Sequence, residues 1–242
     1  MAIWDDVIGP DERRSYERAG PRLPTGFGEM PALVIVDMYR AFVDPAYPHA
    51  TPNAVPTAAR IGTLLDAFRE RALPVFFTTA ARQPTPASQG RWKVHGTPPS
   101  ALMLSPIAYE IWPDLQPRSD EYIFVKTHPS AFFGTTLTSQ LIYHRVDTLV
   151  VTGTVTSGCV RGTCLDAFNL NYRIMVPHDC VCDRGEVSHK VALFEVQMKY
   201  GDVVTADDVL NYLKSRHAKP SSVRSRLPTA PPVRRKKNRA RN

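Results

Sequence analysis

The stretch VVTGTVTSGCVRGT, residues 150–163, runs from an apolar segment through Gly-Thr-Val-Thr-Ser-Gly to a single cysteine, Cys159. Branched apolar residues followed by a turn rich in glycine and hydroxyl residues are typical of a buried strand that gives way to a helix. The whole chain has only four cysteines. Cys159 is therefore either a small packed side chain or a reactive thiol at the end of a strand.

Other segments of the chain repeat the strand pattern and alternate with helical patterns. The predicted strands are PALVIVD (31–37), LPVFFTT (73–79), EYIFVK (121–126), DTLVVTG (147–153) and YRIMVP (172–177). Helical spacing relates Ile61, Leu64, Leu65 and Phe68, then Val187, Val191, Phe194 and Met198, and a last helix covers 205–215. This alternation predicts a three-layer α/β fold, a mostly parallel sheet of about six strands with helices on both faces.

The charge of the chain is unevenly distributed. Residues 214–242 hold 11 of the 30 Lys and Arg residues and none of the 23 Asp and Glu residues. Residues 1–213 are left with a net charge of about −4. We expect a folded domain over 1–213 and a basic, disordered tail over 214–242. The tail either makes weak contact with a polyanion or is only a solubilising extension.

Several classes of protein are disfavoured by the composition. The start, MAIWDDVIGPDERR, is acidic where a secretion signal is basic and apolar, and no run approaches the roughly 18 apolar residues of a membrane span. Four sparse cysteines make no disulfide framework, and Cys180 and Cys182 lack the spacing of a zinc clamp. The glycines of GFG (26–28) precede a strand, unlike a dinucleotide fingerprint. We expect a cytoplasmic protein with no metal and no cofactor.

Three reactive side chains fall at the carboxyl ends of predicted strands. Asp37 ends the first strand, Lys126 ends the third, and Cys159 opens the helix after the fourth. Each residue alone has an ordinary alternative, as a cap, a solvated lysine or a core cysteine. Open parallel sheets bind ligands at this edge, so the convergence of all three predicts an active site there.

The chemistry of this trio favours acyl transfer to the cysteine. A helix start and a nearby ammonium lower the pKa of a thiol, and both are expected at Cys159. Asp37 can take the thiol proton and return it to a leaving amine. The turn before the cysteine offers backbone N–H groups that hold an oxyanion.

At these residues the chain resembles the isochorismatase-like cysteine hydrolases, in the branch of the N-carbamoylsarcosine and maleamate amidohydrolases. The resemblance covers residues 5–213 and rests on PALVIVDMYRAFVDP, FVKTHPSAFFGTTL, LVVTGTVTSGCVRGTCLDAF and CVCDRGEVSH with FEVQMKYGDVV after it. It implies Cys159 as nucleophile, Asp37 as proton carrier and Lys126 as the charge that holds the thiolate. It also implies a cis peptide bond from Thr154 to Val155 and an oxyanion hole made by the N–H groups of Val155 and Cys159.

The resemblance further implies how substrate is bound. Arg184 lies in the segment from which relatives supply a carboxylate-binding arginine, although a surface arginine on a loop is the plain alternative. Thr156 and Phe42 are further candidates for substrate binding, with Tyr39, Trp92 and Phe133 as aromatic candidates for the pocket wall. We expect Cys164, Cys180 and Cys182 to pack in the core, and a direct role for His128 is disfavoured. Family members assemble as homotetramers or dimers.

The family also narrows the reaction. True isochorismatases lack the cysteine, and nicotinamidases carry an Asp-x-His-x-His metal cluster where this chain reads TTAARQPTP. We therefore predict a cysteine-dependent amidohydrolase that cleaves a C–N bond of a small linear amide or carbamoyl acid and releases ammonia through a thioester. One alternative is an amidase or lactamase for a bulky natural product, with the long loop over 80–120 forming an open cleft. The other is a non-catalytic scaffold with a polyanion-binding tail.

Overall fold

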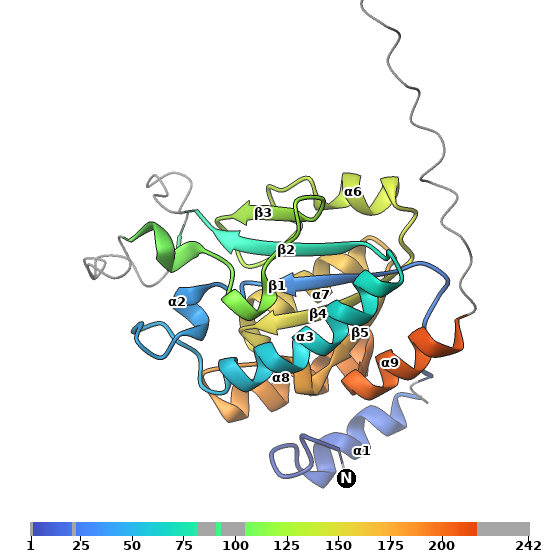
Figure 1. The fold of residues 1–242 in the computed structure, drawn as a ribbon. Coiled ribbons are helices and arrows are strands. Elements are labelled where there is room, and N and C mark those ends of the chain that lie inside the picture. The colour runs from blue at the N-terminus through green and yellow to red at the C-terminus, as the bar shows by residue number, and fades with distance from the viewer. Residues whose placement is uncertain (1, 21–22, 82–90, 93–104, 217–242) are drawn as a thin grey trace, which may run out of the picture.

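The computed structural model describes residues 2–20, 23–81, 91–92 and 105–216, and its centre is a seven-stranded parallel sheet. Six strands follow the order β3-β2-β1-β4-β5-β7, and β6 pairs with the end of β4. Figure 1 shows β3, β2, β1, β4 and β5 side by side in this order. Their bounds are β1 Pro31–Val36, β2 Val75–Ala80, β3 Tyr122–Lys126, β4 Thr148–Thr154, β5 Arg173–Pro177, β6 Val181–Cys182 and β7 Asp202–Val204. The α/β prediction is confirmed, with a seventh strand because β6 and β7 are too short to give a sequence pattern.

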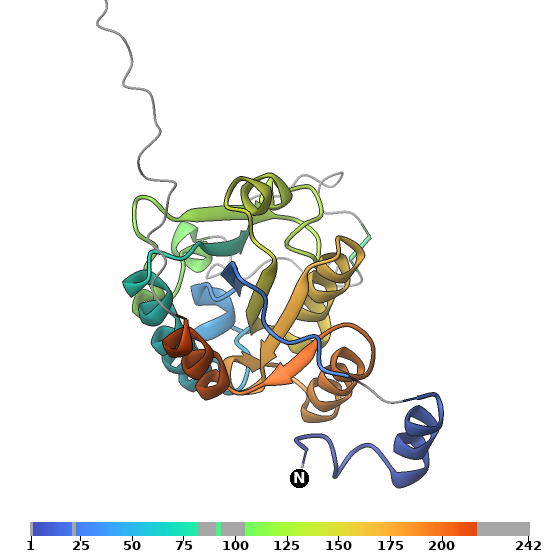
Figure 2. The same cartoon turned by 90° about the vertical axis from the view of Figure 1, so that its right-hand side faces the viewer.

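Helices cover both faces of the sheet. The chain forms α1 (Pro10–Arg18), α2 (Arg40–Val43), α3 (Ala54–Glu70), α6 (Leu137–Tyr143), α7 (Arg161–Asn169), α8 (Glu186–Lys199) and α9 (Ala206–Ser215). Figure 2 looks along the strands and shows α3 and α9 on one side of the sheet and α7 and α8 on the other. These are the three layers that the alternating pattern predicts.

The central strand explains why the sequence pattern is so apolar. All six residues of β1 are buried. Val34 and Val36 belong to the core cluster that includes residues of α7 and α8, whereas Leu33 and Ile35 belong to the cluster that includes residues of α3 and α9. Side chains alternate between the faces of a strand, so a strand covered on both faces must be apolar at every position.

Two predicted burial patterns are wrong at the margins of the fold. The edge strand β3 exposes Tyr122, Ile123 and Val125, although we read its sequence as a strand buried on both faces. On α8, Phe194 is buried and Val191 and Met198 pack against the core, but Val187 in the first turn is exposed. The predicted tail lies almost entirely outside the described residues, and within them no helix has the length and apolar character needed to cross a membrane.

The order of the strands creates a crevice at one edge of the sheet. The chain runs from β1 outward to β2 and β3 and then returns to β4 on the other side of β1. Connections leaving the carboxyl ends of β1 and β4 therefore part in opposite directions. The ends of these two strands carry Asp37 and the turn that leads to Cys159.

Gly153 allows β1 and β4 to meet closely at this crevice. Its φ is +109°, and a Cβ atom there would lie 2.0 Å from the carbonyl oxygen of Val36. No side chain fits at that distance, and the backbone conformation itself is one that favours glycine. The glycine thus sets the approach of the two strands one residue before Asp37.

We predict that Gly153→Ala lowers the free energy of unfolding by about 3 kcal/mol or more, because the methyl group collides with backbone that cannot move independently. The matched control is Gly62→Ala in α3, where an added Cβ meets nothing within 4 Å. That change should raise stability by up to about 1 kcal/mol through helix propensity. Denaturant unfolding measures both, and a tolerated Gly153→Ala would refute the close contact.

Candidate active site

The turn that carries Cys159 begins with a cis peptide bond. The bond between Thr154 and Val155 is cis, as the resemblance implies, and Thr156–Val160 forms a π-helical turn that leads into α7. Within this turn the N–H groups of Gly158 and Val160 donate to the Val155 carbonyl over 3.0 and 3.2 Å. Short π-helical turns are frequent at functional sites. Cys159 thus lies in the turn just before α7 instead of opening that helix.

Asp37 is held in a fixed orientation by its neighbour Thr78 on β2. The Asp37 N–H donates to Thr78 Oγ1 over 3.0 Å, and the Thr78 hydroxyl donates to Asp37 Oδ1 over 2.7 Å. The backbone of Asp37 has φ +55°, in the left-handed region, where aspartate is more tolerated than most residues. The strand end and Thr78 together aim the second carboxylate oxygen into the crevice.

Lys126 forms a buried ion pair with Asp37. Its ammonium donates to Asp37 Oδ2 over 2.6 Å and to the His128 carbonyl over 3.1 Å, and the two charged side chains are only 5% and 3% exposed. Burial alone would lower the pKa of Lys126, but the Asp37 carboxylate and the nearby Cys159 outweigh it, and the pKa is raised. The lysine therefore stays charged, and its charge is matched by Asp37.

The Cys159 thiol lines the same cavity as both charged groups, and both act on its pKa. Burial, followed by the Asp37 carboxylate, raises the pKa of Cys159 to about 12, and Lys126 offsets only part of this effect. The prediction of a lowered pKa for the Cys159 thiol is therefore wrong. Its physical reason is that the ammonium is already paired with a carboxylate that also faces the sulfur.

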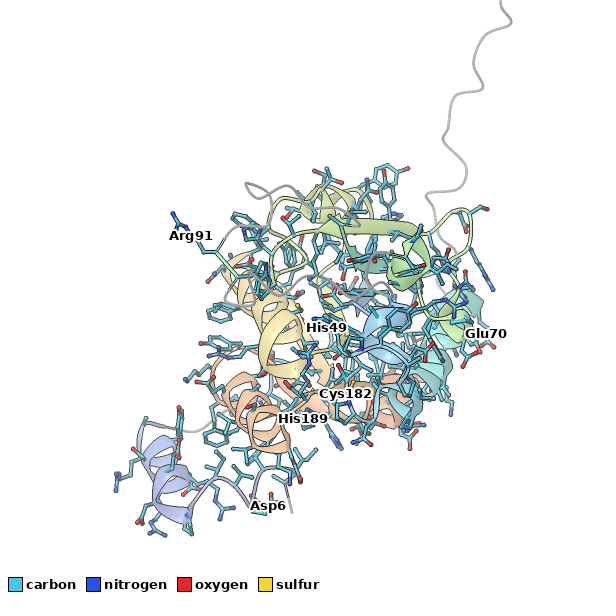
Figure 3. The ribbon with its side chains drawn as sticks, turned by 90° about the vertical axis from the view of Figure 1, so that its left-hand side faces the viewer. Asp6, His49, Glu70, Arg91, Cys182 and His189 are labelled. Carbon is cyan, nitrogen blue, oxygen red and sulfur yellow. The ribbon has the colours of Figure 1, made fainter. Side chains whose placement is uncertain are left out.

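A cavity of about 520 Å³ opens above these three side chains. Its wall includes the aromatic residues Tyr39, Phe42, Trp92 and Tyr109, together with His49 and Arg184. Tyr109 reaches the wall because the segment around it is tied to the residues after β1, with Arg40 N–H donating to Glu110 O and Trp112 N–H to Met38 O. Figure 3 views this end of the molecule, with His49 labelled near its middle.

Arg184 lies at the cavity and not at a remote surface. Its guanidinium donates to the His49 carbonyl over 3.2 Å and lies 5.2 Å from the centre of the Phe42 ring. A guanidinium over an aromatic face is attracted by the ring electrons, so Phe42 orients the arginine as well as forming the wall. The site thus has a cationic group on the wall in addition to the buried Lys126.

The remaining candidate residues take different places. The Thr156 hydroxyl bonds to His189 Nδ1 over 2.8 Å, and Thr156 is not among the described residues that line the cavity. Phe133 is 60% exposed beside the His128 ring, whose side chain lines the cavity. Cys164, Cys180 and Cys182 are buried in the core, as predicted.

Sequence reasoning missed Thr78, His49 and Tyr109. Thr78 lies in a strand that carries none of the predicted site residues, Tyr109 lies in the long loop over 80–120, and His49 lies between α2 and α3. Their partners are 30 or more residues away along the chain. No local pattern marks such contacts.

Comparison with known proteins agrees with this fold. The family model described as the isochorismatase domain matches residues 31–208. Maleamate amidohydrolase of Pseudomonas putida is 34% identical over 191 residues, which cover 78% of this chain and 89% of that protein. N-carbamoylsarcosine amidase of an Arthrobacter species is 31% identical over 208 residues, or 82% and 76% of the two chains. The solved N-carbamoylsarcosine amidase of Thermoplasma acidophilum has a TM-score of 0.60 at 30% identity and covers 74% of this chain and 97% of its own.

The chain belongs to the isochorismatase domain family. It is an enzyme of the hydrolase class. The prediction that it acts on C–N bonds other than peptide bonds is confirmed. The family resemblance read from the sequence is confirmed as well.

We predict that Asp37→Asn makes the Cys159 thiol easier to deprotonate, because it removes a carboxylate that raises the thiol pKa and leaves Lys126 in place. The rate of alkylation by iodoacetamide follows the thiolate fraction. In the unchanged protein this rate should still be rising at about pH 10, and in the variant the curve should shift to lower pH.

Mass spectrometry locates the adduct, and Cys159→Ala gives the background from the three other cysteines. An unchanged pH curve in Asp37→Asn would show that the carboxylate does not act on the thiol.

Proposed function

We propose that the protein hydrolyses the terminal amide or carbamoyl group of a small carboxylic acid, with Cys159 as nucleophile and ammonia as leaving group. One observation carries the proposal. A thiol, a carboxylate and an ammonium meet at the buried end of a cavity whose wall presents a guanidinium.

The first chemical step is attack of the thiol on the substrate carbonyl. Asp37 takes the proton from Cys159 as the sulfur bonds to the carbonyl carbon, so a free thiolate need not accumulate. The carbonyl oxygen becomes an oxyanion that the N–H groups of Val155 and Cys159 bind. Lys126 stabilises the negative charge that moves between the carboxylate and the sulfur.

The next steps release ammonia and then the acid. Asp37 returns its proton to the amine as the C–N bond breaks, which leaves a thioester on Cys159. A water molecule gives a proton to Asp37 and attacks the thioester carbonyl. The C–S bond then breaks, the sulfur takes the proton back from Asp37, and the acid departs. The same carboxylate thus acts as base and acid in each half of the reaction.

Arg184 favours a substrate with a carboxylate. Its planar guanidinium can donate two parallel hydrogen bonds to a carboxylate, and Phe42 and the His49 carbonyl already orient it. The names of the relatives fit this class, because maleamate and N-carbamoylsarcosine both combine a carboxylate with a terminal amide or carbamoyl group. N-carbamoyl amino acids and maleamate-like acids are the substrates we propose.

We predict that a panel of N-carbamoyl amino acids, maleamate, biuret and simple primary amides includes a compound from which the protein releases ammonia. Cys159→Ala should lower the rate on the order of 10⁴-fold, because the attacking atom is gone. The control Cys164→Ala, in the buried face of α7, should stay within about threefold when corrected for folded protein. Ammonia release that persists in Cys159→Ala would contradict the thiol mechanism.

We predict that Arg184→Met raises KM about 100-fold for acid substrates and much less for the corresponding neutral amides, because only the acids use the guanidinium. Arg184→Lys keeps the positive charge but loses the planar pair of donors. Its KM for acid substrates should lie between those of the unchanged protein and Arg184→Met. Steady-state kinetics on a matched acid and ester pair measures the difference. Equal effects on both members would remove Arg184 from substrate recognition.

The two alternative functions have distinct signatures. An amidase for a bulky natural product would cleave a large lactam and leave the small acids untouched. A non-catalytic scaffold would release no ammonia from any compound and form no adduct on Cys159, and deletion of 214–242 would remove its biological effect. The first alternative depends on the loop over 80–120, of which residues 82–90 and 93–104 lie outside the described residues. The second depends on the tail over 214–242, of which only 214–216 are described.

Homo-oligomerisation and cytoplasmic location stay predictions. Large apolar side chains are exposed on and after α7, among them Leu165, Phe168 and Leu170, and on the outer strand β3. Clustered exposed apolar residues favour contact with a second copy of the chain, which light scattering in solution would test.

All four cysteines are free, as expected for a protein in a reducing compartment.

A further inference from the structure

Two side chains from the segment after β6 hold the turn that carries Cys159. The Ser157 N–H donates to Asp183 Oδ2 over 2.6 Å, and the Thr156 hydroxyl shares a hydrogen bond of 2.8 Å with His189 Nδ1. Asp183 and His189 are not among the described residues that line the cavity. Neither takes part in the chemical steps proposed above.

The turn needs partners outside itself. Its internal hydrogen bonds include those from Gly158 and Val160 to Val155 O. The N–H of Ser157 and the hydroxyl of Thr156 both point to the segment after β6 instead. A charge-assisted bond from a backbone N–H to a carboxylate is among the stronger hydrogen bonds of a protein. Asp183 and His189 therefore restrain the two residues that immediately precede Gly158 and Cys159.

Asp183 also restrains Arg184. Its second carboxylate oxygen, Oδ1, accepts from the Arg184 N–H over 2.7 Å. One carboxylate thus bonds to the nucleophile turn on one side and to the backbone of the wall arginine on the other. This side chain therefore links the turn that carries Cys159 to the backbone of the arginine on the cavity wall.

His189 comes from α8, on the face of the sheet that α7 also covers, and is labelled in Figure 3. Burial lowers its pKa, although the nearby Asp183 and Glu186 act against this effect. A neutral imidazole can share a hydrogen bond with the Thr156 hydroxyl in either tautomer. This bond fixes Thr156 without adding a charge beside the turn.

We propose that Asp183 and His189 are positioning residues that fix the Cys159 turn, and that Asp183 also sets the spacing between Cys159 and Arg184. The link from spacing to substrate rests on the proposed function. The restraint of the turn does not, because it concerns the thiol alone. A displacement of about 1 Å at a reacting group can cost 100-fold in rate, so the restraint is expected to matter for turnover.

The two residues should differ in what they control. Asp183→Asn places an amide N–H₂ against a backbone N–H on one side, so it should lower kcat about 10- to 100-fold and raise KM for acid substrates. His189→Leu loses only the bond to Thr156 and should lower kcat while leaving KM within about twofold. His189→Asn, whose amide can replace Nδ1 toward the hydroxyl, should recover most of the lost kcat.

The control is Asp202→Asn. Asp202 is a buried carboxylate that, like Asp183, accepts two backbone N–H groups, from Thr25 over 3.2 Å and from Gly26 over 2.8 Å. It lies at β7, among residues that are not part of the cavity. Its replacement should cost a comparable amount of stability and leave kcat and KM unchanged once the folded fraction is measured.

A second readout does not depend on turnover. Cys159 is only 8% exposed, and burial is the main cause of its raised pKa, so a loosened turn should make the thiol more reactive. Alkylation by iodoacetamide should be about 3- to 10-fold faster in Asp183→Asn and His189→Leu, and unchanged in His189→Asn and Asp202→Asn.

The outcomes separate this inference from the proposed function. Faster alkylation in the two positioning variants, in a protein that hydrolyses none of the panel, would support the restraint while the proposed function fails. Equal kcat and equal alkylation in Asp183→Asn and Asp202→Asn would overturn the inference even with full amidohydrolase activity. So would a His189→Asn variant that behaves like His189→Leu.

Discussion

The candidate active site depends on the buried ion pair between Lys126 and Asp37. Two charges removed from water are costly unless each is fully paired, and here the lysine also reaches the His128 carbonyl while Thr78 donates to the carboxylate. These partners come from β3, β2 and the end of β1, three adjacent strands. The strands must therefore pair in the correct register before the charges can be buried. The paired strands supply the hydrogen-bond partners of both charged groups. Without this pairing the two groups would be buried without partners.

Sequence and elementary chemistry predict the layout of the site well. Carboxyl ends of parallel strands lie at one edge, so Asp37, Lys126 and Cys159 could be brought together from strand patterns alone. The buried strands could be recognised because side chains on both faces must be apolar, as in β1. The error at β3 has the same origin, because an apolar edge strand and an apolar central strand look alike in sequence.

The finer features of the site depend on contacts between distant parts of the chain. Thr78, His49 and Asp183 act through partners that no spacing rule connects to them. The thiol pKa shows the same limit. The sequence predicts both a lysine and a carboxylate near the thiol. Only the structure shows how deeply the sulfur is buried and that the lysine is already paired with Asp37, so that the pKa of Cys159 is raised.

The protonation of the Cys159 thiol limits its reaction with electrophiles and oxidants. Electrophilic probes and peroxides react with thiolates, and the raised pKa of Cys159 keeps its thiol protonated at neutral pH. The thiol is thereby spared the oxidation and stray alkylation that accompany a permanently ionised cysteine. Simple electrophiles would therefore label this cysteine poorly. Under the proposed mechanism, a compound that places a carbonyl carbon next to the sulfur would instead react as the proton passes to Asp37.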